Sequence, residues 1–438
     1  MNEFLEIKRR ATEFRKSESY PEASNLYRDL WINHRDACNE WDGWSYATCL
    51  RKLGDSVKAL EICREVYQKH PKFENGNNLY AWCIYDTEIK KSDEDIDNDR
   101  KSFFKAASAI LELTSQSQYS PYAKTVFKVI DYITKNNASY PASDVLQWVN
   151  RLDAQSLSQE PFPYKDREQK NREIPSDNEK YYAIKTKALY KDCAYQECIN
   201  LCNTGLSEIK KFHYSNDIWL KRRIALSKSK LGDKENALSE LENILKSRKE
   251  WFIQYELAKI SYEIGEKDKA LSYCVDAALN FGKDEHKWEL FLFMAQILKD
   301  MGEIDTAKKH LSFAVKIREE NDWKISETLN KMIADYKIED LGHLKRKELF
   351  KQLKSFWESK KYSSLPFMNG TVKTILSNGK AGFITGDDQN DYYFEVRGFK
   401  GNIRTLNIGL KVKYNITDSF DMKKNRETKK AVNIRKVT

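Results

Sequence analysis

Glycine and proline are scarce in this chain of 438 residues, which has 16 glycines and 8 prolines. Their scarcity excludes collagen-like and low-complexity sequences, and it argues against a sandwich rich in tight turns. It favours helices, whose interiors exclude both residues. The sequence also lacks any apolar run near the roughly 20 residues that a membrane-spanning helix needs. These absences predict a helical protein with no membrane span.

Secretion and metal-binding signals are also missing. The first ten residues are charged and contain no apolar segment, so we expect no secretory signal and a cytoplasmic protein. The eight cysteines are spread along the chain, which predicts reduced thiols. The closest three are Cys193, Cys198 and Cys202, and no fourth thiol or histidine stands nearby at zinc-site spacing. We expect these three to be buried core residues, and we expect no metal and no cofactor.

Signals for catalysis are equally sparse. The six histidines are scattered, and none forms a metal pair or a nucleophile motif with a neighbouring residue. The sequence contains no glycine-rich phosphate loop. We therefore predict no catalytic residues and a protein that is not an enzyme.

Positive charge is concentrated at the C-terminal end. The chain has 75 basic and 66 acidic residues, a net charge of +9. From Leu341 to the end there are 21 basic and 9 acidic residues, so the preceding 340 residues carry a small negative excess. A local basic excess is typical of a polyanion-binding surface, although a solvated tail would have the same composition.

Four segments repeat a glycine that has an alanine five residues later and another seven residues earlier. The glycines are Gly54, Gly232, Gly265 and Gly302. The alanines that follow them are Ala59, Ala237, Ala270 and Ala307. The alanines that precede them are Ala47, Ala225, Ala258 and Ala295. This spacing predicts helix hairpins, with the glycine in the left-handed conformation that ends the first helix. An acidic residue after each glycine favours the start of the second helix.

The pattern resembles the tetratricopeptide repeat, whose period is about 34 residues, over about residues 1–335. Residues 75–160 fit this period poorly, and 90–100 are expected to form an exposed polar loop. The resemblance implies a solenoid whose concave face binds a protein partner. The residues expected to project from that face, where they would suit an acidic ligand, are Lys187, Arg222, Lys230, Lys259 and Lys299.

Composition divides the chain further. Residues 158–178 hold three prolines among mixed charges and are predicted to link two helical blocks. Residues 336–365 have apolar positions at helical spacing together with many lysines, which predicts a basic helix that caps the solenoid. The predicted domains are the N-terminal repeats 1–157, the linker 158–178, the second helical block 179–335, the capping or hinge helix 336–365 and a small β domain 366–438.

The last seventy residues change to a period of two. They predict strands at 368–376, 380–385, 391–397, 410–417 and 430–437, and five short strands with one long connection favour a small OB-type barrel. The pieces Gly370-Thr371-Val372-Lys373, Gly382-Phe383-Ile384-Thr385, Asp391-Tyr392-Tyr393-Phe394 and Ala431-Val432-Asn433-Ile434 follow in the order of a cold-shock domain, which this segment resembles. The fold class is therefore multidomain, an all-α tetratricopeptide-like solenoid followed by a small all-β barrel.

The resemblance implies binding of single-stranded nucleic acid on exposed aromatic and basic side chains. The family's tryptophan, one aromatic residue and one histidine are replaced by Thr374, Ala381 and Glu395, whereas Phe383 and Tyr393 remain. The predicted nucleic-acid contacts are Lys373, Lys380, Phe383, Tyr393, Arg397, Lys400, Arg404, Lys411, Lys413, Lys423, Lys424 and Arg426.

Together these patterns predict a non-enzymatic adaptor. Its solenoid would bind a protein partner, and its barrel would bind single-stranded RNA or DNA. Two alternatives stay open at this point. The barrel could have lost nucleic-acid binding and left a pure protein scaffold, or the chain could be a subunit of a bacterial antiviral or conflict system.

Overall fold

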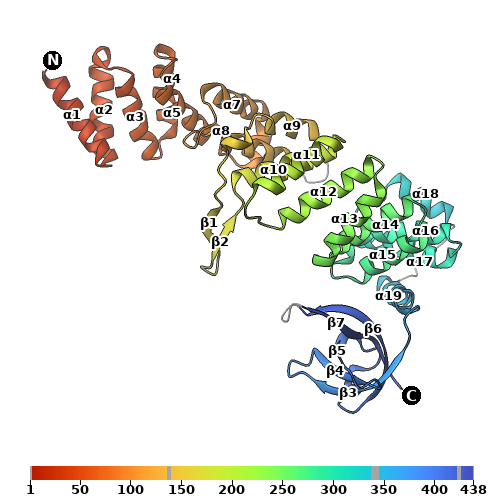
Figure 1. Cartoon of the computed structure of the whole chain (residues 1–438). Helices are drawn as coiled ribbons and strands as arrows, with labels where there is room; N and C mark the ends of the chain where they lie inside the picture. The colour runs from red at the N-terminus through yellow and green to blue at the C-terminus, as the bar shows by residue number, and fades with distance from the viewer. Residues whose placement is uncertain (1, 136–139, 337–344, 422–425, 438) are drawn as a thin grey trace. The chain divides into compact units, whose positions relative to one another are not determined.

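The computed structural model describes residues 2–135, 140–336, 345–421 and 426–437 (Figure 1). It divides into two compact units, Met1–Asp233 and Lys234–Thr438. Helices form most of the first unit and the beginning of the second, and five strands follow in the second unit (Figure 1). Within the described ranges, no helix is long and apolar enough to cross a membrane.

Helix hairpins build the first unit. Short turns join α1 to α2, α3 to α4 and α10 to α11, and each pair packs together (Figure 1). The bounds are α1 Asn2–Lys16, α2 Tyr20–Asn33, α3 Glu40–Lys52, α4 Ser56–Lys69, α5 Glu74–Ile84, α6 Asp93–Asn98, α7 Arg100–Leu113, α8 Tyr122–Ile133, α9 Ala142–Val149, β1 Phe162–Lys165, β2 Asn171–Ile174, α10 Asp177–Lys191, α11 Tyr195–Glu208 and α12 Asn216–Lys230.

The repeated glycines take the conformation that their spacing predicts. Gly54 has φ +86° directly after α3, and the three other repeat glycines have φ between +83° and +98°. The acidic residue that follows Gly54 begins the next helix, because the Asp55 carboxylate accepts a hydrogen bond from the Lys58 backbone N–H at 3.2 Å. The prediction of left-handed glycine turns is confirmed, and the helical part is built of tetratricopeptide-like hairpins.

The polar stretch 90–100 differs from the expected exposed loop. It contains the short helix α6, in which Ile96 is buried in the core formed by α5 to α10. The next residue, Asp97, accepts hydrogen bonds from the Tyr132 hydroxyl at 2.6 Å and from the Lys135 amine. Burial of the single apolar residue Ile96 helps to fix this segment. The overall polarity of the stretch concealed this buried residue in the sequence.

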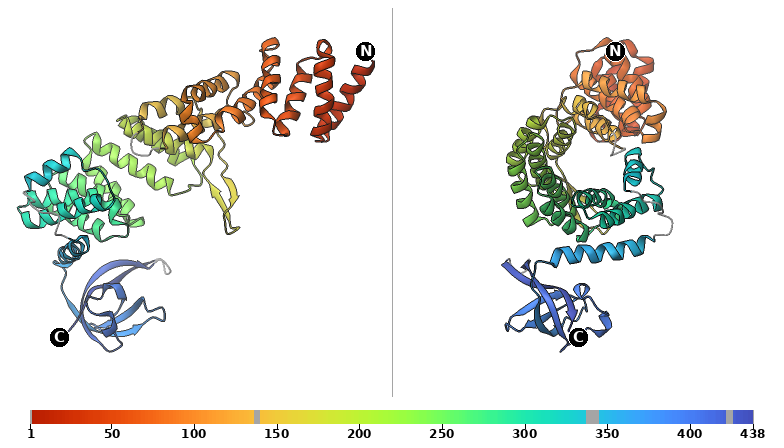
Figure 2. Two further views of the ribbon diagram at one scale, coloured as in Figure 1. Left: turned by 180° about the vertical axis from the view of Figure 1, so that it is seen from behind. Right: turned by 90° about the vertical axis from the view of Figure 1, so that its right-hand side faces the viewer.

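Residues 158–178 also differ from the expected linker. They form the antiparallel hairpin β1–β2, which extends away from the helices of its unit (Figures 1 and 2). Its two ends meet, because Asn178 donates its backbone N–H to the Ser158 carbonyl at 3.1 Å and its side-chain amide to the Ala154 carbonyl at 2.9 Å. Residues on both sides of the hairpin, including Leu157 and Tyr182, share one hydrophobic core.

A buried carboxylate fixes the base of this hairpin. Glu179 of α10 is almost fully buried and accepts hydrogen bonds from the His213 backbone and from the Asn216 side chain. The His213 ring bonds Glu179 at 2.7 Å and Glu173 of β2 at 3.3 Å. Burial opposes protonation of the ring, but the two carboxylates outweigh it and raise the pKa of His213.

The second unit begins with further hairpins and ends with strands. Its elements are α13 Lys234–Ser247, α14 Trp251–Glu263, α15 Lys267–Leu279, α16 Trp288–Asp300, α17 Ile304–Glu320, α18 Glu327–Asp335, α19 Arg346–Tyr362, β3 Met368–Ile375, β4 Ala381–Gly386, β5 Asp391–Glu395, β6 Lys411–Asp421 and β7 Arg426–Lys436. The helix α19 falls in the predicted capping segment, whose residues 337–344 lie outside the described residues.

Helix α19 covers the end of the helical stack in its unit. It packs on α15 and α17 through Leu349, Leu353 and Trp357, which recur every four residues and are buried. The Trp357 ring stacks on Phe291 with centroids 5.4 Å apart and an interplanar angle of 7°. This packing buries the apolar stripe of α19.

The last five strands correspond to the predicted ones and form one sheet. Its order is β3-β4-β5-β7-β6, and the sheet closes because β3 also pairs with β6 (Figure 2). All neighbours are antiparallel except β5 and β7, which run parallel. Side chains from every strand fill the interior, among them Val372, Ile384, Phe394, Val412 and Ile434.

Candidate nucleic-acid interface and helical pocket

Phe383 and Tyr393, the two predicted stacking residues, lie side by side on the outer face of the sheet. They are direct partners across β4 and β5. Because the neighbouring residues Ile384 and Phe394 point into the core, the side chains of Phe383 and Tyr393 point outward. Their rings meet edge to face, with centroids 5.8 Å apart and an interplanar angle of 73°. Tyr393 is 37% exposed and Phe383 is partly buried. The two rings therefore contact each other and are not both fully open to a base.

Acidic side chains neutralise part of the charge beside this pair. The Lys373 amine lies 2.5 Å from the Asp391 carboxylate, which also accepts a hydrogen bond from the Thr385 hydroxyl. These two hydrogen bonds, the one from Lys373 foremost, lower the pKa of Asp391 and keep it charged.

A second carboxylate, Glu395, compensates two further cations of this face. It forms ion pairs with Arg397 and with Lys430, the latter at 3.8 Å. Of the basic residues predicted to surround the aromatic pair, Lys373 and Arg397 are therefore ion-paired. The sequence resemblance missed the Lys373–Asp391 pair because strand register brings these two residues together, whereas Glu395 and Arg397 are only two residues apart in the chain.

The other predicted barrel residues are distributed over several surfaces. Lys400 forms an ion pair with Glu358 of α19 at 2.5 Å. Lys413 lies over the ring of Phe367, 5.4 Å from its centroid. The exposed residues Lys380, Arg404, Lys411 and Arg426 form no ion pair within the described ranges, whereas Lys423 and Lys424 lie outside the described residues.

The basic residues predicted on the helical repeats fall in both units. Lys187, Arg222 and Lys230 belong to the first unit, and Lys259 and Lys299 belong to the second. Their common concave face stays a prediction.

Most of these side chains lie against aromatic rings of their own unit. Lys187 is 5.8 Å from the Tyr140 ring, and Arg222 lies over Trp219. Lys259 covers Tyr255 and pairs with Glu256, and Lys299 covers Tyr336, while Lys230 is exposed. Desolvation, followed by the charges of Arg223 and Lys191, lowers the pKa of Lys187.

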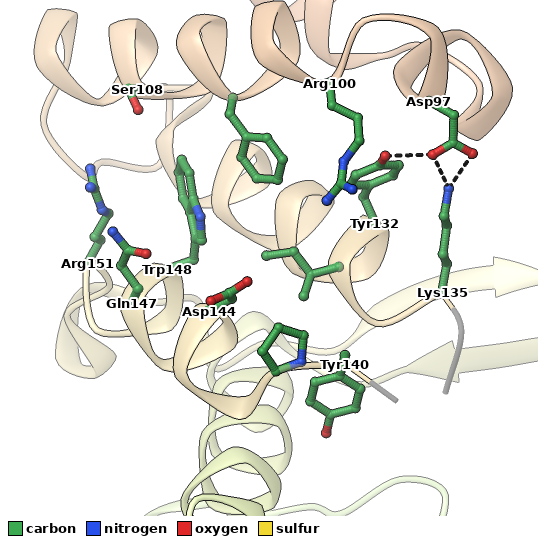
Figure 3. A pocket seen from close by; sticks show the side chains of 13 residues that line it. Asp97, Arg100, Ser108, Tyr132, Lys135, Tyr140, Asp144, Gln147, Trp148 and Arg151 are labelled. Carbon is green, nitrogen blue, oxygen red and sulfur yellow. Dashed lines mark hydrogen bonds and ion pairs between the residues drawn. The ribbon is translucent and has the colours of Figure 1, made fainter. Parts of the chain in front are cut away.

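A pocket that sequence reasoning did not single out lies among α7, α8 and α9. Its volume is about 620 Å³, and its walls include Phe104, Tyr132 and Trp148 (Figure 3). Arg100 lies over Tyr132 at 5.6 Å and Arg151 over Trp148 at 4.9 Å. The aromatic residues were visible in the sequence, but the poor fit of 75–160 to the repeat period concealed that they converge.

The chemistry of this pocket is mixed. Lys135 and Asp97 neutralise each other at one side, as the dashed lines in Figure 3 mark. Within the described residues, the guanidinium groups of Arg100 and Arg151 form no ion pair, and Asp144 points into the same space (Figure 3). The pocket therefore combines aromatic walls with charged groups of both signs.

The clustered cysteines behave in two ways. Cys198 and Cys202 are fully buried in the core of α10 to α12, as predicted, but Cys193 is exposed. Its backbone has φ +62° in the turn between α10 and α11, which turns the residue out of the core. In the part of the chain that the structure describes, no three histidine, cysteine or acidic residues gather as metal ligands would.

Comparison with known proteins adds one family model and several solved structures. A family model described as a domain of unknown function (DUF7017) matches residues 218–355, from α12 to α19. No curated protein matches the chain. Among solved structures, MamA from Desulfovibrio magneticus, from residue 41 to its end, aligns at 13% identity. The alignment covers 46% of this chain and 97% of that chain, with a TM-score of 0.33.

Two further structures are similar over longer stretches. A tetratricopeptide repeat protein from Parabacteroides merdae aligns at 13% identity over 68% of this chain and 98% of its own, with a TM-score of 0.29. The human IFIT1 dimer with PPP-AAAA aligns at 10% identity over 81% of this chain and 80% of its own, with a TM-score of 0.38.

Proposed function

We propose that this chain is a non-enzymatic adaptor. Its helical hairpins bind a segment of a protein partner, and its C-terminal barrel binds single-stranded nucleic acid. The proposal assigns recruitment, not chemistry, to the molecule.

The observation that carries the nucleic-acid arm is the topology of the barrel together with its charge. A closed five-stranded sheet with parallel pairing of its third and fifth strands, β5 and β7, is typical of OB-type domains, which bind single strands. From residue 366 onwards there are 14 basic and 7 acidic residues, so the domain attracts a polyanion. The cold-shock resemblance agrees with this topology.

The partner-binding arm is supported by the pocket of α7 to α9. Stacked helix hairpins are a common scaffold for binding peptides. The aromatic walls of Trp148 and Phe104 offer apolar area. The guanidinium groups of Arg100 and Arg151 lie over aromatic rings, form no ion pair with any described residue, and offer contacts for an acidic or carbonyl-rich segment. We therefore place the partner's anchor side chain in this pocket.

One observation favours a second candidate function. Around Phe383 and Tyr393, the carboxylates Asp391 and Glu395 form ion pairs with three basic residues and leave one positive charge among the five groups. A face whose charges are mostly compensated suits a protein partner better than a phosphate backbone. The alternative is therefore a scaffold whose barrel docks protein only.

A titration of the full-length protein separates the two functions. We expect the anisotropy of fluorescein-labelled U12 and dT12 to rise on binding, and the affinity to fall steeply between 50 and 200 mM KCl because phosphate contacts release counterions. A labelled 12-base-pair duplex of mixed sequence should bind more weakly, because its bases are not free to stack. No binding of any of the three at 50 mM KCl would refute the nucleic-acid arm and favour the scaffold.

A further inference from the structure

An exposed aromatic ring flanked by two cations stands where the chain enters β3. Phe367 keeps 45% of its surface exposed. The Lys413 amine lies 5.4 Å from its ring centroid, and the Arg435 guanidinium lies 5.6 Å from it. Lys413 and Arg435 are direct partners across β6 and β7, so the sheet itself sets their spacing. This cluster, Phe367 with Lys413 and Arg435, lies apart from the Phe383–Tyr393 pair.

Buried amide groups hold the cluster in position. Asn415 is fully buried, and its side-chain N–H groups donate to the carbonyls of the two residues before Phe367, at 2.9 and 3.0 Å. The Asn433 amide donates to the Asn415 side-chain oxygen at 2.7 Å. The Arg435 Nε in turn donates to the Asn433 side-chain oxygen at 3.3 Å. One chain of hydrogen bonds therefore fixes both the backbone that carries the ring and the guanidinium beside it.

The charge around this ring is less compensated than the charge around the predicted pair. Lys413 of β6 pairs with Arg435 of β7, and Lys411 stands two residues before Lys413, so these three side chains share one face of the sheet. Lys436 pairs with the core residue Val412 and lies on the other face. Within the described residues, none of Lys411, Lys413 and Arg435 forms a salt bridge. One acidic residue, Asp387, approaches this end of the sheet. Its backbone N–H donates to the carbonyl of Asn369. Asn369 is the β3 residue that pairs with Lys413.

A second carboxylate, Asp388, also stands at this end, because its Oδ1 and the Tyr414 hydroxyl both lie close to Gly386. Lys411, Lys413 and Arg435 outnumber these two carboxylates, so the balance of these described groups stays positive.

We propose that the cluster of Phe367, Lys413 and Arg435 is the nucleotide-binding platform of the barrel. A base stacks on the Phe367 ring and the Arg435 guanidinium plane, and flanking phosphates contact Lys411 and Lys413. This inference rests on the proposed nucleic-acid function and moves the contact from the β4–β5 face to the β3–β6–β7 face.

A single strand satisfies this cluster better than an acidic peptide does. Both ligands supply negative charge for the three cations. Only the nucleic acid also supplies a flat ring for every phosphate, which covers the exposed aromatic surface that an acidic peptide leaves in water. An exposed aromatic ring beside two cations, of which the Arg435 guanidinium is held by hydrogen bonds, therefore matches the alternation of base and phosphate.

The test compares two aromatic sites in the full-length protein. Phe367→Ala is expected to weaken U12 and dT12 binding roughly fivefold or more at 100 mM KCl, because it removes one stacking contact. Arg435→Gln should weaken binding by a similar factor, and the Gln side chain is still able to bond Asn433. Phe383→Ala combined with Tyr393→Ala is the matched aromatic control, and it should change the affinity less than twofold.

The outcomes separate this inference from the function on which it rests. If wild-type protein binds both strands but Phe367→Ala and Arg435→Gln bind equally well, the platform lies elsewhere and the inference fails alone. If wild-type protein binds neither strand, the proposed function fails too. If poly-glutamate displaces U12 and its own binding also depends on Phe367, the site prefers acidic peptides. Thermal unfolding of each variant checks that the barrel remains folded.

Discussion

At the level of single residues, the aromatic pair and its counter-charges show what the sequence reveals and what it hides. The cold-shock resemblance predicts Phe383 and Tyr393 as a stacking pair, and the structure makes them neighbours. Asp391 and Glu395 were overlooked as partners of the nearby lysines. A salt bridge between strands depends on register, which no local pattern in this sequence specifies.

Another residue with a role that spacing does not indicate is His310 on α17. It is fully buried, its Nδ1 bonds the Thr306 carbonyl at 2.8 Å, and its Nε2 accepts a hydrogen bond from the Trp357 indole N–H at 2.8 Å. Both ring nitrogens are therefore used by the neutral imidazole. Burial lowers the pKa of His310 from 6.5 to about 4, although the Thr306 bond opposes the shift.

This histidine predicts acid sensitivity of the contact between α17 and α19. Its pKa is lower in the folded protein than in the unfolded chain, so its contribution to stability is complete above pH 6.5 and is lost as the pH falls towards 4. We expect the free energy of unfolding to drop by roughly 2 kcal/mol between pH 7 and pH 5 from this group alone. Hydrogen exchange of the α17 and α19 amides, followed at increasing urea concentration at pH 7 and at pH 5, measures this drop in the free energy of unfolding.

The matched variants are His310→Gln and, as a control, His286→Gln at an exposed position of the same unit. His310→Gln is less stable at pH 7 but should show a smaller loss at pH 5, because glutamine does not titrate at this buried position. The same pH dependence in wild type and His310→Gln would contradict the assignment.

At the level of elements, the glycine turns were the most predictable feature and the β1–β2 hairpin the least. Each repeat glycine ends a helix where its spacing to alanine requires it, since a left-handed residue there closes the hairpin. The hairpin at 158–178 was taken for a linker, because prolines and mixed charges fit either. The hydrogen bond between the buried Glu179 and His213 fixes the base of this hairpin, and these two residues are 34 positions apart in the sequence.

The turn at Gly265 gives a test of this element. Gly265 has φ +89° and nothing within 4 Å of an added Cβ, so Gly265→Ala meets backbone strain but no clash. We expect Gly265→Ala to lower the free energy of unfolding by about 1 kcal/mol, the cost of a left-handed alanine less the entropy it removes from the unfolded chain. Gly265→Asn is the control, because asparagine tolerates this conformation and should cost less. Equal melting temperatures for both variants would contradict this account.

At the level of the whole molecule, charge was predictable and the division into units was not. Counting residues placed the basic excess in the last hundred positions, and the barrel lies there. The division into units falls between Asp233 and Lys234, inside the predicted block 179–335. The sequence around Gly232 reads like the other repeat turns, so local patterns carry no mark of this boundary.

This separation of charge predicts where a nucleic acid touches the full chain. The 340 residues before Leu341 carry slightly more acidic than basic groups, so a polyanion gains little there even though Trp148 and Arg100 line an aromatic pocket. Photo-crosslinking of U12 containing 4-thiouridine to full-length protein, read by mass spectrometry, should give peptides from the last hundred residues. Phe367→Ala should reduce these crosslinks. Abundant crosslinks to α7, α8 or α9 would show instead that the helical pocket binds the nucleic-acid strand. The nucleic-acid role would then belong to the helices and the partner-binding role to the barrel.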